Sequence, residues 1–275
     1  MGNFPLFVHP GCPDDNFATC NYTSYARRTL RNNDTTAASP GYFTIELNNS
    51  VLAEMTATSH AALYRFSFPD EDTLWDGAQE VPYSPVILAD LTDLAVTRRA
   101  GGVEVYDSGR IIGDGLYGPS FGQGEYSAFF CADFKGAKIR KTGTFLNLQA
   151  VEEPKFLDGV GSGMRIPSGS VGAWIQFERP PKNSILARVG VSFQSTDQAC
   201  ANAEAEIPKF DFVGTVRKAE DAWREKLSAI EVDATGVDEE LQTTFWSGLY
   251  RALLSPQNYT GENQLWDSDE PYFDS

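Results

Sequence analysis

Residues 211 to 230 read DFVGTVRKAEDAWREKLSAI, and here the hydrophobic period of the chain changes. Apolar side chains recur at spacings of three and four, at Val213, Val216, Ala219, Trp223, Leu227 and Ile230. That spacing predicts an amphipathic helix. Its other face is charged and places Glu220 four residues before Arg224, a favourable helical pair. The helix divides the chain into a longer part before it and a shorter part after it.

The shorter part contains a second predicted helix. Asp238, Glu239 and Glu240 stand where the helix dipole favours carboxylates, and Pro256 ends the pattern. Its apolar stripe is formed by Leu241, Phe245, Leu249, Ala252 and Leu253. We expect the first helix to be a connector and the second to begin a helical domain.

The longer part shows the alternation of half-buried strands, beginning near Gly41. The expected strands lie at about 43–47, 51–58, 64–68, 85–91, 103–105, 110–112, 126–134, 138–146, 173–177 and 185–193. Since no helical pattern separates them, they favour an antiparallel sandwich over a parallel sheet. Residues 1–40 have no period and predict a long surface loop, residues 71–80 an acidic loop, and residues 197–206 a short helix.

The charge balance limits the classes of partner. Lys and Arg number 22 against 38 Asp and Glu, for a net charge of −16. Such a surface repels nucleic acids and anionic membranes, so we expect neither as a partner. No apolar run is long enough to span a bilayer, and no signal peptide opens the sequence. The protein is therefore either cytosolic or lacks its original N-terminus.

The cysteines and sequons favour an exported protein. The four cysteines include no Cys-x-x-Cys pair and so do not have the usual spacing of zinc ligands. We therefore expect a disulfide between Cys12 and Cys20, and consider Cys131 with Cys200 a possible second pair. Potential N-glycosylation triplets begin at Asn21, Asn33, Asn48 and Asn258.

Several motifs have structural interpretations. Residues 113–118 match the letters of a dinucleotide fingerprint, but Pro119 follows and no helix begins there, so we predict a turn. His9 and His60 are too far apart in sequence to indicate a zinc site or a triad, and structural roles are expected. Acidic residues between 267 and 274 lack the glycine of an EF-hand and predict a solvated loop.

Tryptophan side chains are candidates for stacking on sugar rings. Trp174 belongs to a strand pattern and Trp223 to a helix stripe, so both are expected in the core. Trp75 and Trp266 are the exposed candidates. A glycosidase commonly uses two carboxylates, but composition does not nominate a pair among 38 acidic residues.

Several segments resemble a known family. They are 2–7 (GNFPLF), 39–43 (SPGYF), 53–56 (AEMT), 62–66 (ALYRF), 89–91 (ADL) and 185–193 (ILARVGVSF). Together they resemble the N-terminal region of glycoside hydrolase family 92, the calcium-dependent exo-acting α-mannosidases, in their fungal form. Residues 245–256 (FWSGLYRALLSP) resemble the beginning of the family's catalytic (α/α)6 domain.

The resemblance implies a mainly β fold in three parts. It implies a supersandwich-like antiparallel β-sandwich over 1–206, a helical linker over 207–236, and the first helix of an incomplete (α/α)6 barrel over 237–275. It implies an exo-α-mannosidase, with α-1,2 linkage preferred, that acts on mannose-containing N-glycans or mannan. Secretion or passage through the secretory pathway is expected from the cysteines and sequons described above. The resemblance sets no oligomeric state.

The resemblance also bears on the site. Family members extend beyond both ends of a chain like this one, and their general acid, general base and calcium ligands lie in the later part. No catalytic or metal-binding residue is therefore assigned here, calcium is expected only in a longer enzyme, and the chain alone is expected to be inactive. Asn3, Trp75 and Trp266 are taken as candidate substrate-binding residues. The alternatives are a non-catalytic carbohydrate-binding sandwich, or a sandwich-plus-barrel hydrolase or phosphorylase of another family.

Overall fold

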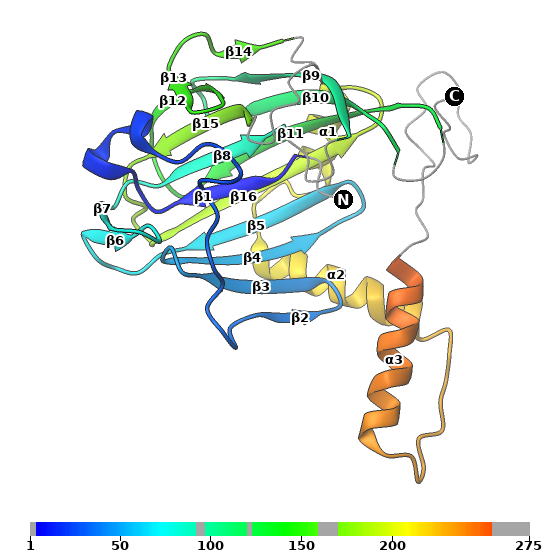
Figure 1. Cartoon of the computed structure of the whole chain (residues 1–275). Coiled ribbons are helices and arrows are strands. Elements are labelled where there is room, and N and C mark those ends of the chain that lie inside the picture. Colours follow the sequence, from blue (N-terminus) through cyan, green and yellow to red (C-terminus); the bar gives the residue numbers. More distant parts are fainter. Residues whose placement is uncertain (1–3, 92–96, 120–122, 159–169, 255–275) are drawn as a thin grey trace.

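The computed structural model describes residues 4–91, 97–119, 123–158 and 170–254. Within these residues two antiparallel sheets pack face to face, and the helices follow them in the chain (Figure 1). The small sheet has the order β1 (Leu6–His9), β8 (Val86–Asp90), β15 (Val171–Phe177), β12 (Ile139–Leu146) and β13 (Gln149–Val151). The large sheet has the order β14 (Phe156–Leu157), β9 (Arg98–Val105), β10 (Ile111–Tyr117), β11 (Tyr126–Lys135), β16 (Ser184–Ser192), β5 (Ala61–Ser67), β4 (Val51–Ala57), β3 (Tyr42–Leu47) and β2 (Ala37–Ser39). The expected antiparallel sandwich is confirmed.

The core lies between the two sheets. Ile87 and Ala89 of β8 face side chains such as Val51, Phe66 and Phe130 of the large sheet. The other side of the small sheet is also covered, because Val86 and Leu88 belong to a second apolar cluster with Trp174, Phe145 and Tyr22. Burial on both faces explains why residues 85–91 form a continuous apolar run instead of an alternating one.

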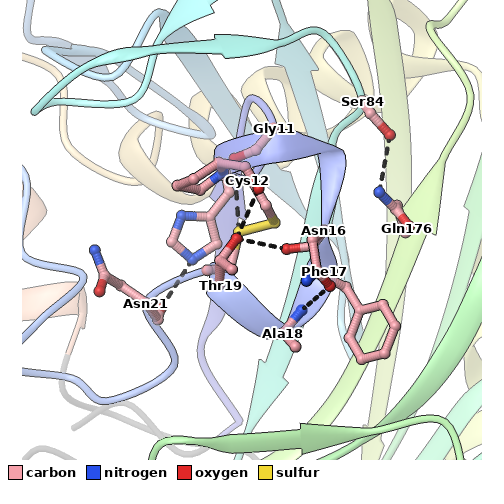
Figure 2. The surroundings of a disulfide bond; sticks show 12 residues. Gly11, Cys12, Asn16, Phe17, Ala18, Thr19, Asn21, Ser84 and Gln176 are labelled. Carbon is pink, nitrogen blue, oxygen red and sulfur yellow. Dashed lines mark hydrogen bonds between the residues drawn. A yellow bond between two sulfur atoms is a disulfide. The ribbon is translucent and has the colours of Figure 1, made fainter.

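The expected surface loop over residues 1–40 is wrong in part. Strand β1 pairs with β8 at the edge of the small sheet, and the turns η1 (Pro13–Asp15) and η2 (Phe17–Thr19) follow it. The confirmed disulfide Cys12–Cys20 closes this segment (Figure 2). Phe17 stacks on Trp174 with ring centroids 4.3 Å apart. Tyr22 is fully buried. The segment has no hydrophobic period because it follows the outer face of the small sheet in tight turns.

The turn expected at residues 113–118 is also wrong, because residues 113–117 lie within β10, the strand between β9 and β11. Gly113 pairs with Val103 on one side and Phe130 on the other. A Cβ at Gly113 would lie 2.6 Å from both the Gly102 carbonyl oxygen and the Phe130 ring. The glycine therefore makes room for the ring and does not form a bend.

Residues 71–80, expected to be a loop, contain most of a small hairpin. Strand β6 (Thr73–Trp75) pairs with β7 (Glu80–Pro82). Asp76 Oδ1 accepts hydrogen bonds from the backbone N–H groups of Ala78 and Gln79 and so holds the turn between them. Hydrogen bonding by a turn aspartate favours the hairpin despite the acidic composition.

The three predicted helices are confirmed in the described part of the chain: α1 (Thr196–Glu206), α2 (Phe212–Leu227) and α3 (Glu239–Leu254). The disulfide Cys131–Cys200 joins α1 to β11. Helix α2 lies on the large sheet, where Phe212 and Val216 pack with Leu63. Helix α3 extends away from the sandwich (Figure 1). None of the described helices is long and apolar enough to cross a membrane.

Candidate functional site

Trp75 is the one predicted sugar-contacting residue that lies within the described structure. It ends strand β6, and 39% of the residue is exposed. The Ser50 hydroxyl donates a hydrogen bond of 3.0 Å to its carbonyl oxygen, so the turn between β3 and β4 holds the hairpin in place. An exposed indole on a fixed backbone has the apolar face that stacks on a pyranose ring.

A hollow of about 240 Å³ lies next to this hairpin, on the outer face of the large sheet. Its lining is formed by Glu46, Ser50, Leu52, Ser67, Phe68 and Pro69. Ser50 both lines the hollow and donates its hydroxyl to the backbone oxygen of Trp75. The Glu46 carboxylate already accepts a hydrogen bond of 2.9 Å from Asn32, which orients it. An aromatic side chain beside hydroxyl and carboxylate groups is chemistry suited to a sugar, although the volume is below that of an ordinary ligand pocket.

Two carboxylates converge at the other end of the large sheet. A Cβ on Gly102 would lie 3.4 Å from Asp114 Oδ1 and 3.5 Å from Asp158 Oδ1. Burial raises the pKa of Asp114, the charge of Asp158 raises it further, and a hydrogen bond with the Gly102 backbone lowers it in part. A carboxyl group that holds its proton more tightly is able to donate a hydrogen bond or a proton at mildly acidic pH.

The larger hollow, of about 530 Å³, lies where α1 meets the large sheet, and Arg110 and Asp133 are among its lining residues. Arg110 binds Asp133 through two hydrogen bonds of 2.8 and 3.0 Å, and also binds Glu204 of α1 at 2.6 Å. Arg188 Nη2 donates to the same Asp133 carboxylate at 2.5 Å. Burial alone would raise the pKa of Asp133, but the two guanidinium groups outweigh it and lower the pKa. These charges are paired with one another, so the network attaches α1 to the sheet.

The two histidines occupy structural positions. His9 is buried, and its Nε2 lies 2.9 Å from the backbone oxygen of Asn21, beside the disulfide loop (Figure 2). His60 Nδ1 lies 2.7 Å from the Glu206 carboxylate at the end of α1. These contacts agree with the structural roles expected from the sequence.

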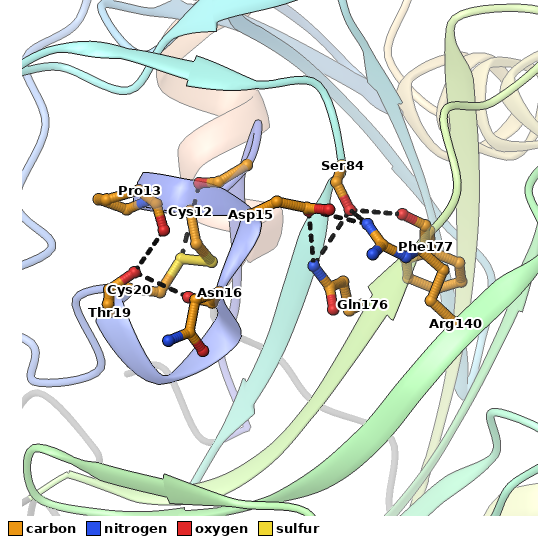
Figure 3. Close-up of polar contacts among 11 residues, drawn as sticks. Cys12, Pro13, Asp15, Asn16, Thr19, Cys20, Ser84, Arg140, Gln176 and Phe177 are labelled. Atoms are coloured by element: carbon orange, nitrogen blue, oxygen red, sulfur yellow. Dashed lines mark hydrogen bonds and ion pairs between the residues drawn. A yellow bond between two sulfur atoms is a disulfide. The ribbon is translucent and has the colours of Figure 1, made fainter.

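The sequence analysis did not predict a polar cluster that lies beside the disulfide loop. Asp15 accepts hydrogen bonds from Arg140 at 2.8 Å and from Gln176 at 3.2 Å, and Ser84 contacts both partners (Figure 3). Asp14 and Asp15 have positive φ angles of 55° and 54°, so this turn holds two non-glycine residues in a left-handed conformation. The partners of Asp15 come from sequence positions more than 100 residues away, which no local pattern indicates.

Comparisons with known proteins divide the chain between residues 192 and 198, where the last strand, β16, ends and α1 begins. The profile of the glycosyl hydrolase family 92 N-terminal domain matches residues 1–192, and that of the family's catalytic domain matches residues 198–275. The chain belongs to glycoside hydrolase family 92. A related protein described as an uncharacterized secreted glycosidase of Arthroderma benhamiae is 44% identical over 280 residues, covering 100% of this chain and 36% of that protein.

Solved structures of family 92 proteins share the fold. The glycosyl hydrolase ccman5 superimposes with a TM-score of 0.72 at 20% identity, covering 95% of this chain and 33% of that one. An inverting mannosidase of Bacteroides thetaiotaomicron gives a TM-score of 0.71 at 19% identity, covering 94% of this chain and 31% of that one. The chain therefore spans about a third of the length of these family 92 proteins. Membership in family 92 rules out the alternative of another sandwich-plus-barrel family.

The described part of this family 92 chain does not fit a calcium ion. Calcium takes about six to eight oxygen ligands, several of them carboxylates. Among the described residues no three His, Cys, Asp or Glu side chains come together in a group that holds a metal. Asp114 and Asp158 are only a pair. The acidic residues between 267 and 274 lie outside the described residues.

Of the three predicted substrate-binding residues, Asn3 and Trp266 lie outside the described residues. Trp75 is exposed as expected, while Trp174 is fully buried. The residue after Asn3, Phe4, is buried against Tyr117 and Phe130, so this family segment is attached to the sandwich core. Sequence reasoning missed the Asp114–Asp158 pair, since β10 brings Asp114 and β14 brings Asp158 to Gly102 from opposite sides of β9.

Proposed function

We propose that this chain is the N-terminal part of an exo-acting α-mannosidase that removes α-1,2-linked mannose from N-glycans or mannan. The observation that carries the proposal is the consecutive match of the two family domains across the chain, in the order sandwich then helices. One solved family 92 structure is that of a Bacteroides thetaiotaomicron α-mannosidase in complex with mannoimidazole, which supports a mannose-containing substrate. The name of the fungal relative supports secretion.

We assign the β-sandwich to residues 1–206, the helical linker to 207–236 and the beginning of the (α/α)6 catalytic domain to 237–275. The exposure of α3 supports this division. Leu241 and Phe245 of the apolar stripe are 58% and 44% exposed, although their spacing is that of a buried helix face. An apolar stripe of this kind needs further helices against which to pack, and a helical domain provides them.

In this proposal the catalytic acid, the base and the calcium ligands belong to parts of a longer enzyme outside this chain. An inverting glycosidase holds its two carboxyl groups about 6.5–9.5 Å apart, which leaves room for the attacking water. Without those groups and the ion, the 275-residue chain alone releases no mannose. Asn3, Trp75 and Trp266 then act as sugar contacts.

A domain replacement tests the proposal. The 280 matching residues of the Arthroderma benhamiae glycosidase are replaced by this chain, and release of mannose from an α-1,2-linked mannobiose is measured with calcium and with a chelator. The replacement enzyme is expected to release mannose only with calcium, and the isolated chain to release none under either condition. Trp75→Ala in the replacement enzyme is expected to raise KM several-fold, with Trp174→Phe as a buried control.

The outcomes separate the alternatives. A folded replacement enzyme that is inactive while its parent releases mannose would contradict the proposed function. Calcium-dependent mannose release by the isolated chain, abolished by substituting one of its own carboxylates such as Asp114→Asn, would place the active site within this chain. Binding of a mannoside by the isolated chain, together with an inactive replacement enzyme, would favour a non-catalytic carbohydrate-binding sandwich.

A further inference from the structure

One edge of the large sheet is made of short, interrupted segments. Strand β2 pairs with the first half of β3. Beyond an intervening turn, residues 30–32 pair with the second half: the Asn32 N–H donates to the Glu46 oxygen at 2.8 Å, and the Asn48 N–H donates to the Leu30 oxygen at 2.7 Å. Figure 1 shows β2 at the border of this sheet.

This edge carries little protection of its own. All residues of β2 are exposed and uncharged, and Leu30 is 76% exposed. Arg31, which pairs with Leu47, places one charge on the segment of residues 30–32, whereas β2 has none. An exposed, uncharged edge strand such as β2 is a template on which another chain can add a strand, and proteins usually cover or interrupt such edges. The shortness of β2 and the turn after residue 32 are partial interruptions.

Two sequons stand at this edge. Asn33-Asp34-Thr35 forms the turn that separates residues 30–32 from β2, and Asn48-Asn49-Ser50 forms the turn between β3 and β4. Both turns are tight, since Asp34 and Ser50 have φ angles of 63° and 61°.

The residues around each asparagine hold these turns. Thr35 donates its hydroxyl to the Asn32 oxygen at 2.9 Å, and Asn49, which is buried, donates its amide to the Val8 oxygen at 3.0 Å. Asn33 and Asn48 are themselves exposed, and no hydrogen bond among the described residues uses their side-chain amides. Each amide is therefore presented to solvent by a fixed turn.

We propose that Asn33 and Asn48 carry N-linked glycans, and that these glycans shield the β2/β3 edge from pairing with other chains. The glycan comes from a lipid-linked oligosaccharide diphosphate of the secretory pathway. The bond between the anomeric carbon and the diphosphate oxygen breaks, the bond from that carbon to the asparagine Nδ2 forms, and Nδ2 loses one proton as the lipid diphosphate leaves. The inference rests on export of the chain, which is part of the proposed function.

The sequon at Asn21 differs from these two. Tyr22 and Thr23 are buried, and the Asn21 backbone oxygen contacts His9 beside the disulfide loop (Figure 2). Asn21 lies beside β1 of the small sheet and belongs to neither of the turns that border β2 and β3. The proposal concerns Asn33 and Asn48 alone.

The test uses the 275-residue chain with Asn21→Gln and Asn258→Gln, so that only the two sequons of interest are left. A host signal peptide directs it into the secretory pathway of a yeast. Peptide mass spectrometry after amidase treatment, which converts a glycosylated Asn to Asp, is expected to find both positions modified. Asn33→Gln and Asn48→Gln are each expected to remove one glycan from the intact mass.

A second measurement tests the shielding. Glycans are trimmed from the folded protein with an endoglycosidase, and growth of β-rich aggregates is followed by thioflavin fluorescence. Trimmed protein and the Asn33→Gln/Asn48→Gln variant are both expected to aggregate several-fold faster than the glycosylated protein. Secreted, disulfide-bonded protein without a glycan at either position would contradict the proposed glycosylation. Equal aggregation rates of the glycosylated and the glycan-free protein would contradict the proposed shielding of the edge. Because the signal peptide is supplied by the host, neither result depends on whether the enzyme's own export or activity is as proposed.

Discussion

Trp223 of α2 lies against Tyr250 of α3, with ring centroids 4.7 Å apart. Among the described residues this aromatic pair joins the linker helix to the helix that extends away from the sandwich. Aromatic pairs contribute about 0.5–1.5 kcal/mol beyond the area they bury. The orientation of α3 in this chain therefore depends on a weak contact.

We expect Tyr250→Ala to release α3 from α2 without affecting the sandwich. Backbone amides of residues 239–254 should exchange faster with deuterium, while the amides of β11 and β16 keep their protection. Leu241→Ala, which truncates a 58% exposed side chain of the same helix, serves as the control. Unchanged exchange in α3 after Tyr250→Ala would mean that other contacts position this helix.

The ion pair between Arg27 and Asp90 should be the most costly to break among the charged pairs of the small sheet. The two side chains are 9% and 0% exposed, and Arg27 also donates to the Tyr22 backbone oxygen at 2.9 Å. Asp90→Asn leaves a buried guanidinium without its counter-charge, which costs about 3–5 kcal/mol. The free energy of unfolding in urea measures this loss.

The matched control for that ion pair is Arg224, whose pairs with Glu220 and Asp221 lie on the surface of α2 and which is itself 68% exposed. Arg224→Met should change the free energy of unfolding by less than about 1 kcal/mol, because exposed pairs contribute little. A loss for Asp90→Asn as small as that of the control would show that Arg27 tolerates burial without a counter-charge.

His9 should make the fold less stable as the solution becomes acidic. Burial lowers its pKa from 6.5 to about 4, although the hydrogen bond to Asn21 raises the pKa in part. Between these values the unfolded chain binds a proton that the folded chain does not, so stability is complete above about pH 6.5 and falls as the pH approaches 4. The shift corresponds to about 3 kcal/mol.

The variant His9→Gln separates the acid destabilisation caused by His9 from that caused by protonation of carboxylates. Glutamine does not titrate, and its side-chain amide still offers a donor to the Asn21 backbone oxygen. The difference in unfolding free energy between the original chain and the variant should be constant above pH 6.5 and shrink by about 3 kcal/mol by pH 4. A difference independent of pH would show that folding leaves the pKa of His9 unchanged.

The two disulfides should contribute unequally. The sequence separations are 8 for Cys12–Cys20 and 69 for Cys131–Cys200. Loop-closure entropy gives about 2–3 kcal/mol for the short loop and about 4 kcal/mol for the long one. Double Cys→Ala variants, compared by denaturation in urea, should show the larger loss for Cys131→Ala/Cys200→Ala. The reverse order would mean that the covering segment of residues 10–22 unfolds with the loss of the short loop.

Several elements followed from local pattern. The predicted helices over 197–206, 211–230 and 238–255 agree with α1, α2 and α3 to within three residues at each end. Helix-forming composition indicated the first, and apolar stripes at spacings of three and four indicated the other two. Strands β3, β4 and β5 followed from alternation. The disulfide Cys12–Cys20 followed from sequence proximity.

Other features depended on distant partners. Residues 10–22 form the cover of the small sheet because Trp174 and Leu88 offer an apolar surface, and no period within the segment shows this. Residues 113–117 belong to a strand because β9 and β11 pair on both sides of them. Asp114 has a raised pKa because burial and Asp158 act on it together.

The sequence by itself thus determined the class of fold, the three helices and the family, since these depend on residue types at fixed spacings along the chain. The tertiary structure alone decided which edge of the large sheet lies beside the sequons of Asn33 and Asn48, which carboxylates meet at Gly102, and how α3 contacts α2. The physical reason is that strand order and packing bring together residues far apart in sequence, and the free energy of those contacts does not depend on any local period.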